Sequence, residues 1–476
     1  MRTLLGRGVL GSALLVSGGL CYARVPDGSW VTRTTWLDSF RSSPAHQPVG
    51  LTLCAVGLVL LTWAWWSLRP YAADDATGVS AVRTAAACWS APLLIAPPLF
   101  SNDGWSYAAT GFLTGHGLSP YVYPPSVLPA SLSSGVSPRW LNTPSPYGPL
   151  AQGWGGAAAH LTSDPWLLLV AYRIFALLGL ALLAWAVPRL AERSGRHPGA
   201  ASWLAVASPF VLAHGVGGVH NDLVVAGLGL AALAVTTHER WVLGAILAGA
   251  AAAVKVPGGL VAVGVVLLSL TASAGYVARV RRGVQVVGVA AATVLGLGVV
   301  TGVGTGWIAS LSVPASLPSQ LSMSHDLGVV LGALPGLHVG PSITLVQNLA
   351  IGAMALAAVL LVLKHPTRAA APILVSVSVL MFYVTLFSPA VHYWYFLWCI
   401  PLLASVAITS ATRGAVAATV VVLGLCAFVD GSLHLGNLTL GTEWLLAATP
   451  LLGFLAIRRL EAARNEASVE SIRLTA

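Results

Sequence analysis

The chain has 476 residues, of which 56% are hydrophobic and 8% are charged, roughly a third of the charged fraction of a soluble domain. This composition excludes an ordinary soluble enzyme and indicates a polytopic integral membrane protein. The formal charge of +9 at pH 7 does not indicate nucleic acid as a partner, because membrane proteins concentrate Lys and Arg on loops that face anionic membrane lipids.

Apolar runs predict an all-α polytopic membrane protein with about twelve to fourteen transmembrane helices. The range reflects several short runs: the 241–271 pair, which Lys255 and Pro257 interrupt, forms either two spans or two half-helices. We expect one membrane domain over residues 1–457 and a short cytoplasmic tail over 458–476. The runs are 4–22, 49–68, 83–100, 166–187, 200–214, 220–237, 241–254, 257–271, 283–301, 342–363, 370–387, 392–409, 414–429 and 441–457.

The distribution of basic residues predicts that both termini lie in the cytoplasm. With the N-terminus inside, most of the 24 Lys and Arg residues fall on cytoplasmic segments, as the positive-inside rule requires. The first run is either a retained anchor or a cleaved signal peptide, since Arg2 and Arg7 precede it. Neither choice changes the side on which later segments lie, in what we expect to be the plasma membrane.

Two long loops then lie on the exterior face, at 101–165 and 302–341. Within the first, residues 146–161 are apolar, but counting them as a span would move Arg189 and Arg196 outside. We therefore expect an interfacial helix there, with Tyr147 and Trp154 at the level of the lipid headgroups.

Asp103 directly follows a predicted span and emerges at the outer surface. One interpretation is an N-cap for a helix that begins near Gly104. The other is a general base at the membrane interface, where Trp105, Tyr107 and Tyr121 would partly desolvate it and offer faces for sugars. Both roles are compatible if one carboxylate oxygen remains available.

His220, Asn221 and Asp222 begin another span on the same exterior face. They either cap that helix or bind an acceptor hydroxyl, and Asp222 would alternatively support the catalytic carboxylate. His325, in the second exterior loop, is a further candidate for sugar binding.

Arg173 and Lys255 are the only cations that lie away from the ends of the predicted apolar stretches, Lys255 within the interrupted 241–271 pair. They either extend to water or pair with a buried acid, or they hold a phosphate and stabilise it as a leaving group. His392 is a similar candidate at the exterior end of a later span, although an aromatic belt alone explains the neighbouring Tyr393, Trp394 and Tyr395.

Several motifs for other chemistries are missing from the sequence. It contains no G-x-x-x-x-G-K-[ST], no H-E-x-x-H and no exterior Asp-x-Asp, and its five cysteines lack the spacing of a zinc site. We therefore expect no nucleotide, metal or other cofactor.

Residues 103–111, 117–121 and 140–150 together resemble the first exterior loop of the actinobacterial polyprenol-phosphate-mannose-dependent α-1,6-mannosyltransferases. This family belongs to the integral-membrane GT-C glycosyltransferases. The resemblance extends through Gly217–Asp222 and Ala251–Lys255, and so covers most of residues 85–260.

The resemblance implies a GT-C-like fold and a mannosyl donor β-linked to polyprenyl phosphate on the outer face. It implies an acceptor that is a lipid-anchored mannan of the lipomannan or lipoarabinomannan type. It also implies that Asp103 is the catalytic base of a metal-independent transfer. The residues themselves fit an inverting attack in which Arg173, Lys255 or His392 stabilises the departing phosphate.

Two other classes remain open from the residues alone. A transporter or lipid-linked-sugar flippase would explain the interrupted helices near Lys255 and Gly217, and a structural partner of an envelope complex has no motif of its own. The long loops gathered on one face and the lack of an internal repeat favour the transferase.

Overall fold

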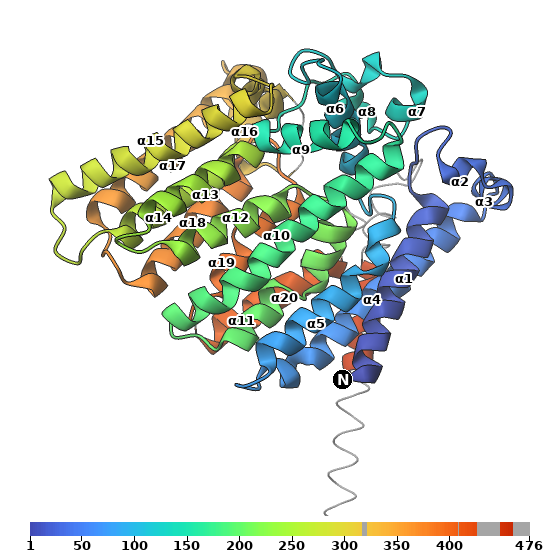
Figure 1. Ribbon diagram of the computed structural model, residues 1–476, viewed down its shortest axis with the longest axis horizontal. Coiled ribbons are helices and arrows are strands. Elements are labelled where there is room, and N and C mark those ends of the chain that lie inside the picture. Colours follow the sequence, from blue (N-terminus) through green and yellow to red (C-terminus); the bar gives the residue numbers. More distant parts are fainter. Residues whose placement is uncertain (317–320, 408, 426–447, 460–476) are drawn as a thin grey trace, which may run out of the picture.

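A computed structural model describes residues 1–316, 321–407, 409–425 and 448–459, and these residues form helices without a β-strand (Figure 1). The predicted all-α polytopic membrane protein is therefore confirmed. Of the predicted segments, 426–429, 441–447 and 460–476 lie outside the described residues.

Seven helical segments within the described ranges are long and apolar enough to cross a membrane. An eighth is the bent pair η3 (Val211–Gly217) and α12 (Asp222–Val235), whose halves meet at 111°. The seven are α1 (Arg2–Tyr22), α4 (His46–Ala72), α5 (Gly78–Ser90) continued by η1 (Pro92–Ile95), α10 (Pro165–Arg193), α15 (Tyr276–Val300), α17 (Val339–Lys364) and α18 (Ala370–Phe387).

The other apolar runs form shorter helices, which accounts for the larger number of spans expected from hydropathy. Lys255 interrupts the 241–271 pair between α13 and η4. The predicted run over 200–214 is divided between α11 and η3. These shorter segments are α11 (Pro198–Ala205), α13 (Trp241–Val254), η4 (Val256–Val261), α14 (Ala262–Ser269), η6 (Tyr393–Trp398), α19 (Ile400–Ala404) and α20 (Ser410–Leu425).

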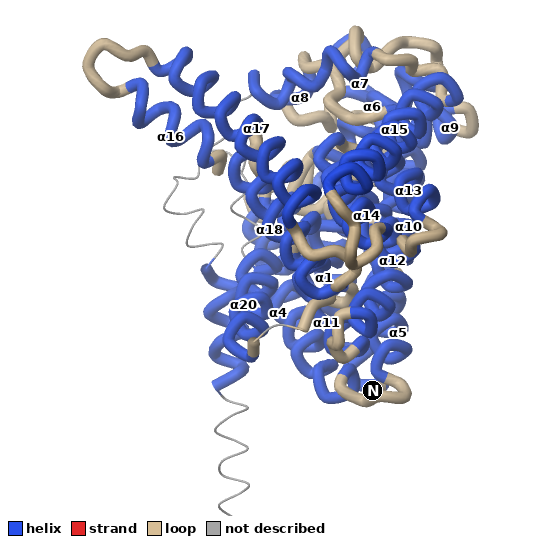
Figure 2. The backbone as a smooth tube through the Cα atoms, turned by 90° about the vertical axis from the view of Figure 1, so that its left-hand side faces the viewer, coloured by secondary structure: helices blue, strands red, loops and turns tan. Residues whose placement is uncertain are grey.

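The first long loop folds into short helices at the end of the molecule opposite the N-terminus (Figures 1 and 2). The predicted helix over 146–161 corresponds to α9, and its position at the membrane surface stays a prediction. The helices of this loop are α6 (Asp103–Gly115), η2 (Pro125–Val127), α7 (Ala130–Ser133), α8 (Pro138–Leu141) and α9 (Pro149–Ala159). The second loop contributes η5 (Gly306–Ser316) and α16 (Met323–Gly332).

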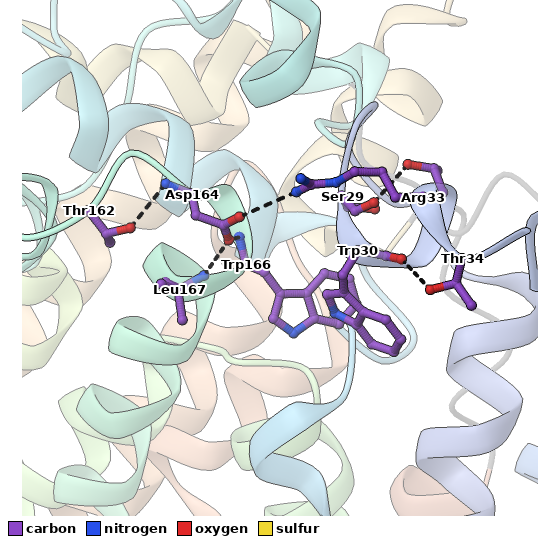
Figure 3. Close-up of polar contacts among 9 residues, drawn as sticks. Ser29, Trp30, Arg33, Thr34, Thr162, Asp164, Trp166 and Leu167 are labelled. Carbon is purple, nitrogen blue, oxygen red and sulfur yellow. Dashed lines mark hydrogen bonds and ion pairs between the residues drawn. The ribbon is translucent and has the colours of Figure 1, made fainter.

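Contacts between α2 (Trp30–Arg33) and the start of α10 join the segment after α1 to the end of the first long loop (Figure 3). Asp164 caps α10 by accepting hydrogen bonds from the backbone N–H groups of Trp166 and Leu167, and it lies 4.0 Å from Arg33. The Trp30 and Trp166 rings meet edge to face at 5.2 Å. The next helix, α3 (Thr35–Arg41), ends at Arg41, whose guanidinium donates to backbone carbonyls at the end of α1.

Four glycines allow α1 and α4 to pack backbone against backbone. A Cβ at Gly57 would lie 2.7 Å from the carbonyl oxygen of Gly11, and a Cβ at Gly50 would lie 2.8 Å from that of Gly18. The pairing of the earlier glycine of one helix with the later glycine of the other makes the helices antiparallel. Membrane helices gain van der Waals contact through such small residues, because lipid supplies no hydrophobic force between them.

We expect Gly57→Leu to lower the thermal unfolding midpoint of the protein in detergent, since overpacking costs about 1–3 kcal/mol. Gly296→Leu is the matched control, because Gly296 is exposed on α15 and a Cβ added there would have no heavy atom within 4 Å. Equal midpoints for the two variants would contradict the close contact between α1 and α4.

Candidate active site

Asp103 is the first residue of α6 and is almost fully buried, with 5% of its surface exposed. Asn102 occupies the N-cap position, so Asp103 lies in the first turn and is not the N-cap residue that one interpretation expected. A carboxylate is favoured there by the positive end of the helix dipole. Phe100, three residues earlier, has a φ of 61°, a left-handed conformation that is rare for a bulky side chain.

The segment before α12 lies directly beside this loop. The Leu99 N–H donates a 3.0 Å hydrogen bond to the Gly217 carbonyl, and the buried His220 places Nδ1 3.8 Å from Oδ2 of Asp103. Asn221 is buried and occupies the N-cap position of α12, but its side chain accepts no hydrogen bond from the first turn of that helix.

Lys255 and Asp222 form a buried ion pair. The Lys255 ammonium lies 2.9 Å from Oδ1 of Asp222, and the Lys255 side chain is 13% exposed. The ammonium also lies over aromatic rings, 3.8 Å from the centroid of Tyr395, 5.1 Å from Trp398 and 5.5 Å from Tyr147. Pairing with a carboxylate and with aromatic faces is how a cation is held in a low-dielectric site.

A cavity of about 450 Å³ joins these groups to the membrane helices. Its polar lining includes four of the predicted site residues, namely Asp103, Tyr147, Lys255 and His392. Its remaining walls are largely apolar and come from η4, η5, α17 and α18. These walls include Leu260, Leu311, Pro314, Ala350, Ile351, Met354, Val384 and Phe387.

A small recess of about 20 Å³ lies on another side of Asp103 and is rich in hydroxyl groups. The Tyr107 hydroxyl is 2.9 Å from the Tyr147 hydroxyl and donates at 3.4 Å to Oδ2 of Asp103. Burial raises the pKa of both phenols well above the usual value, so both keep their protons at neutral pH. The recess is lined by Asp103, Ser106, Tyr107, Thr110, Pro125, Trp140, Thr143, Ser145, Pro146 and Tyr147.

Arg173 has a different role from the one predicted, because its guanidinium is fully buried and donates to backbone carbonyls. These five hydrogen bonds, of 2.6–3.3 Å, leave it turned toward the protein backbone and away from the cavity, so we correct the expectation that it holds phosphate. The acceptors are the carbonyl oxygens of Leu94, Ala96, Pro97, Val216 and Gly217.

Of the other predicted residues, Tyr107 lines only the recess, and six lie outside the lining of both the cavity and the recess, namely Trp105, Tyr121, His220, Asn221, Asp222 and His325. The Trp105 indole N–H donates to the Arg24 carbonyl at 2.8 Å, and the Tyr121 hydroxyl donates to the Tyr147 carbonyl at 3.0 Å. His325 is paired with its neighbour Asp326 on α16 at 3.2 Å. Trp105 and Tyr121 therefore support the loop, and neither they nor His325 offers a face to a ligand in this cavity.

Sequence reasoning missed the aromatic surroundings of Lys255. An aromatic belt accounts for Tyr395 in the sequence, and no motif marks Trp398, yet both residues line the cavity beside the ammonium. The usable signal was Lys255 itself, since a cation at membrane depth needs such neighbours. Within the described ranges, no group of three His, Cys, Asp or Glu side chains is placed to hold a metal ion.

We expect Arg173→Gln to destabilise the protein strongly, by about 3 kcal/mol or more, because several buried backbone carbonyl oxygens lose their donor and each one left unpaired costs about 1–3 kcal/mol. The thermal unfolding midpoint should fall, while the folded fraction should still bind a lipid-phosphate ligand. Arg189→Gln is the control, because Arg189 is exposed and contacts its own helix at Trp185. A loss of ligand binding with no loss of stability would instead restore Arg173 as a phosphate ligand.

Comparisons with known proteins agree with the resemblance found in the sequence. Residues 5–272 match the family described as alpha-(1->6)-mannopyranosyltransferase, N-terminal domain, and residues 320–456 match the MptB C-terminal domain. Alpha-(1->6)-mannopyranosyltransferase A of Mycobacterium tuberculosis is 35% identical over 85% of this chain and 80% of its own length. Alpha-(1->6)-mannopyranosyltransferase B of Corynebacterium glutamicum is 28% identical over 84% of this chain and 72% of its own length. No solved structure matches the chain significantly. These matches confirm the resemblance, and the chain belongs to the actinobacterial α-1,6-mannosyltransferase family of membrane enzymes.

Proposed function

We propose that this mannosyltransferase moves mannose from polyprenyl-phosphate-mannose to the 6-hydroxyl of a lipid-anchored mannan, with Asp103 as general base. The observation that carries the proposal is the position of Asp103 in the wall of a cavity that is also lined by Lys255, which is paired with the buried Asp222, and that is otherwise largely apolar. Such a cavity suits a ligand with a sugar phosphate at one end and a long hydrocarbon at the other.

In the proposed step, Asp103 takes the proton of the acceptor hydroxyl while that oxygen attacks C1 of mannose. The bond between C1 and the phosphate oxygen breaks, and its electron pair leaves with the polyprenyl phosphate. Attack opposite the leaving group converts the β-linkage to an α-linkage. Because Asp103 lines the cavity, a donor and an acceptor hydroxyl held there would meet at its carboxylate.

Lys255 is the proposed ligand of the departing phosphate. An ammonium group has three N–H donors. One is directed at Asp222 and a second interacts with the Tyr395 side chain, so the third can donate to a phosphate oxygen. In a site shielded from water, such donors stabilise the charge that develops on the leaving group. His392 lines the same cavity and is the second proposed phosphate contact.

A groove between α17 and α18 is the proposed place for the isoprenoid chain. Its volume is about 670 Å³, and it shares Met354 and Tyr383 with the site cavity. Its walls are mainly apolar side chains, from Ala353 to Leu361 on α17 and from Val375 to Tyr383 on α18. A hydrocarbon leaving the site cavity would therefore continue directly into it.

We further propose that the site lies on the exterior face of the plasma membrane, with both described ends of the chain toward the cytoplasm. The support is the distribution of Lys and Arg along the sequence, together with the position of α6–α9 at the end of the molecule opposite the N-terminus (Figure 2). Membrane lipids would surround the helices on all sides.

We expect Asp103→Asn to abolish mannosyl transfer and to leave donor binding nearly intact, because only the proton acceptor is removed. The assay uses purified protein in lipid with radiolabelled polyprenyl-phosphate-mannose and a short α-1,6-linked mannoside. Asp164→Asn is the matched control, since Asn replaces Asp as an N-cap at little cost. Normal transfer by Asp103→Asn would refute the base assignment, and donor binding without transfer by the native protein would favour a flippase.

Ala357→Trp, at a position that lines the groove and not the site cavity, should raise the KM for a long-chain polyprenyl donor about tenfold or more, since each buried methylene contributes about 0.8 kcal/mol. The KM for a donor with a two-isoprene chain should change little, because that chain ends near the site. Leu356→Trp is the control on the same helix, as Leu356 is 58% exposed. Equal changes for both donors would place the chain outside the groove.

A further inference from the structure

His220 is a fully buried histidine whose two ring nitrogens have no hydrogen-bond partner among the described residues. Leaving a buried polar group unpaired costs about 1–3 kcal/mol, so each such group in a native protein needs an explanation. The family's transfer chemistry, as proposed above, does not use this side chain.

The orientation of the ring supplies the explanation. Nδ1 of His220 lies 3.8 Å from Oδ2 of Asp103, which is too long for a hydrogen bond but requires a shift of only about 1 Å to become one. The Tyr107 hydroxyl approaches the same oxygen at 3.4 Å. Contacts of this kind are often long in a ligand-free enzyme and shorten when the substrates bind.

The imidazole is held in this orientation by stacking. Its ring lies on Trp394 with centroids 3.7 Å apart and planes 13° apart. Trp394 also stacks on His392 at 4.5 Å and 4°, and His392 lines the site cavity. The stack restrains the ring plane while leaving the nitrogen edge directed at the carboxylate.

The backbone around both side chains is strained. Val219, which precedes His220, has a φ of 60°, a true outlier for a β-branched residue. At Gly218 a Cβ would lie 2.5 Å from the His214 carbonyl oxygen and 2.7 Å from Cδ2 of His220. Together with Phe100 before Asp103, the strain is concentrated on the two loops that carry the pair, as is typical of functional sites.

We infer that His220 is a positioning residue that donates a hydrogen bond to Asp103 and fixes the plane of its carboxylate. The inference rests on the proposed function, because it assigns a partner to the proposed base. His220 does not line the cavity, so it acts on the substrates only through Asp103.

The test compares two substitutions of His220, one that keeps the stacking ring and one that keeps an N–H donor. His220→Phe keeps a ring that stacks on Trp394 and removes both nitrogens, whereas His220→Asn keeps an N–H near the place of Nδ1 and removes the ring. For His220→Phe, kcat should fall about 30- to 100-fold with donor KM within about threefold, as for a misplaced catalytic group. His220→Asn should recover kcat to within about tenfold of the native value.

Stability provides a readout that separates positioning from a structural role. His220→Phe removes an unpaired buried polar group, so its thermal unfolding midpoint should equal or exceed the native value. A loss of kcat accompanied by an equal loss of stability in both variants would assign His220 to packing. A raised KM with unchanged kcat would assign it to substrate binding, and either result would overturn the inference.

A second experiment repeats His220→Phe in an Asp103→Glu background. A residue that acts through Asp103 loses its effect when that carboxylate is displaced. His220→Phe should therefore lower kcat much less in the Asp103→Glu background than in the native protein. Additive effects would contradict the inference. If Asp103→Asn is inactive and His220→Phe is normal, only the role of His220 fails, whereas activity of Asp103→Asn would refute the proposed base itself.

Discussion

Arg173 donates hydrogen bonds to five backbone carbonyl oxygens at two breaks between helices, and the arrangement of the site depends on this interaction. The carbonyls belong to two segments, residues 94–97 and 216–217, which lead directly into the loops of Asp103 and His220. Where water is excluded, irregular backbone persists only if other protein groups supply its hydrogen bonds. One guanidinium with five N–H donors therefore allows two helices to be broken side by side, and their ends bring the two side chains together.

Sequence reasoning selected ionisable residues that the structure brings to this cavity, but it did not identify their partners. Asp103 and Lys255 stand out because an ionisable residue near membrane depth is costly and needs a reason. The same argument selected Arg173, whose reason is structural, since a sequence does not show which carbonyl groups a helix break leaves unpaired. The contact of Tyr395 with Lys255 was also not predictable from the sequence, because an aromatic belt at the membrane surface and an aromatic lining around a cation have the same composition.

Hydropathy likewise predicted the class of fold better than the number of spans. Each apolar run does form helix where the structure describes it, but a run interrupted at Lys255 or at Gly217 divides into short helices. Hydropathy measures burial in lipid or protein without distinguishing them, so it does not reveal where a helix stops inside the molecule. In this protein the interruptions are the informative features, because both lie at the candidate active site.

The unpaired polar atoms and the strained backbone of this region have a common physical cause. His220 has unpaired nitrogens, Oδ2 of Asp222 has no hydrogen-bond partner among the described residues, and Phe100 and Val219 are strained. A site that binds a charged sugar phosphate must keep donors and charges oriented before the ligand arrives, since reorientation during the reaction would raise the barrier. Full mutual satisfaction of these groups would make the protein alone more stable and would leave fewer interactions for the ligand to gain. The unpaired atoms are therefore consistent with a polar network completed only when both substrates are bound.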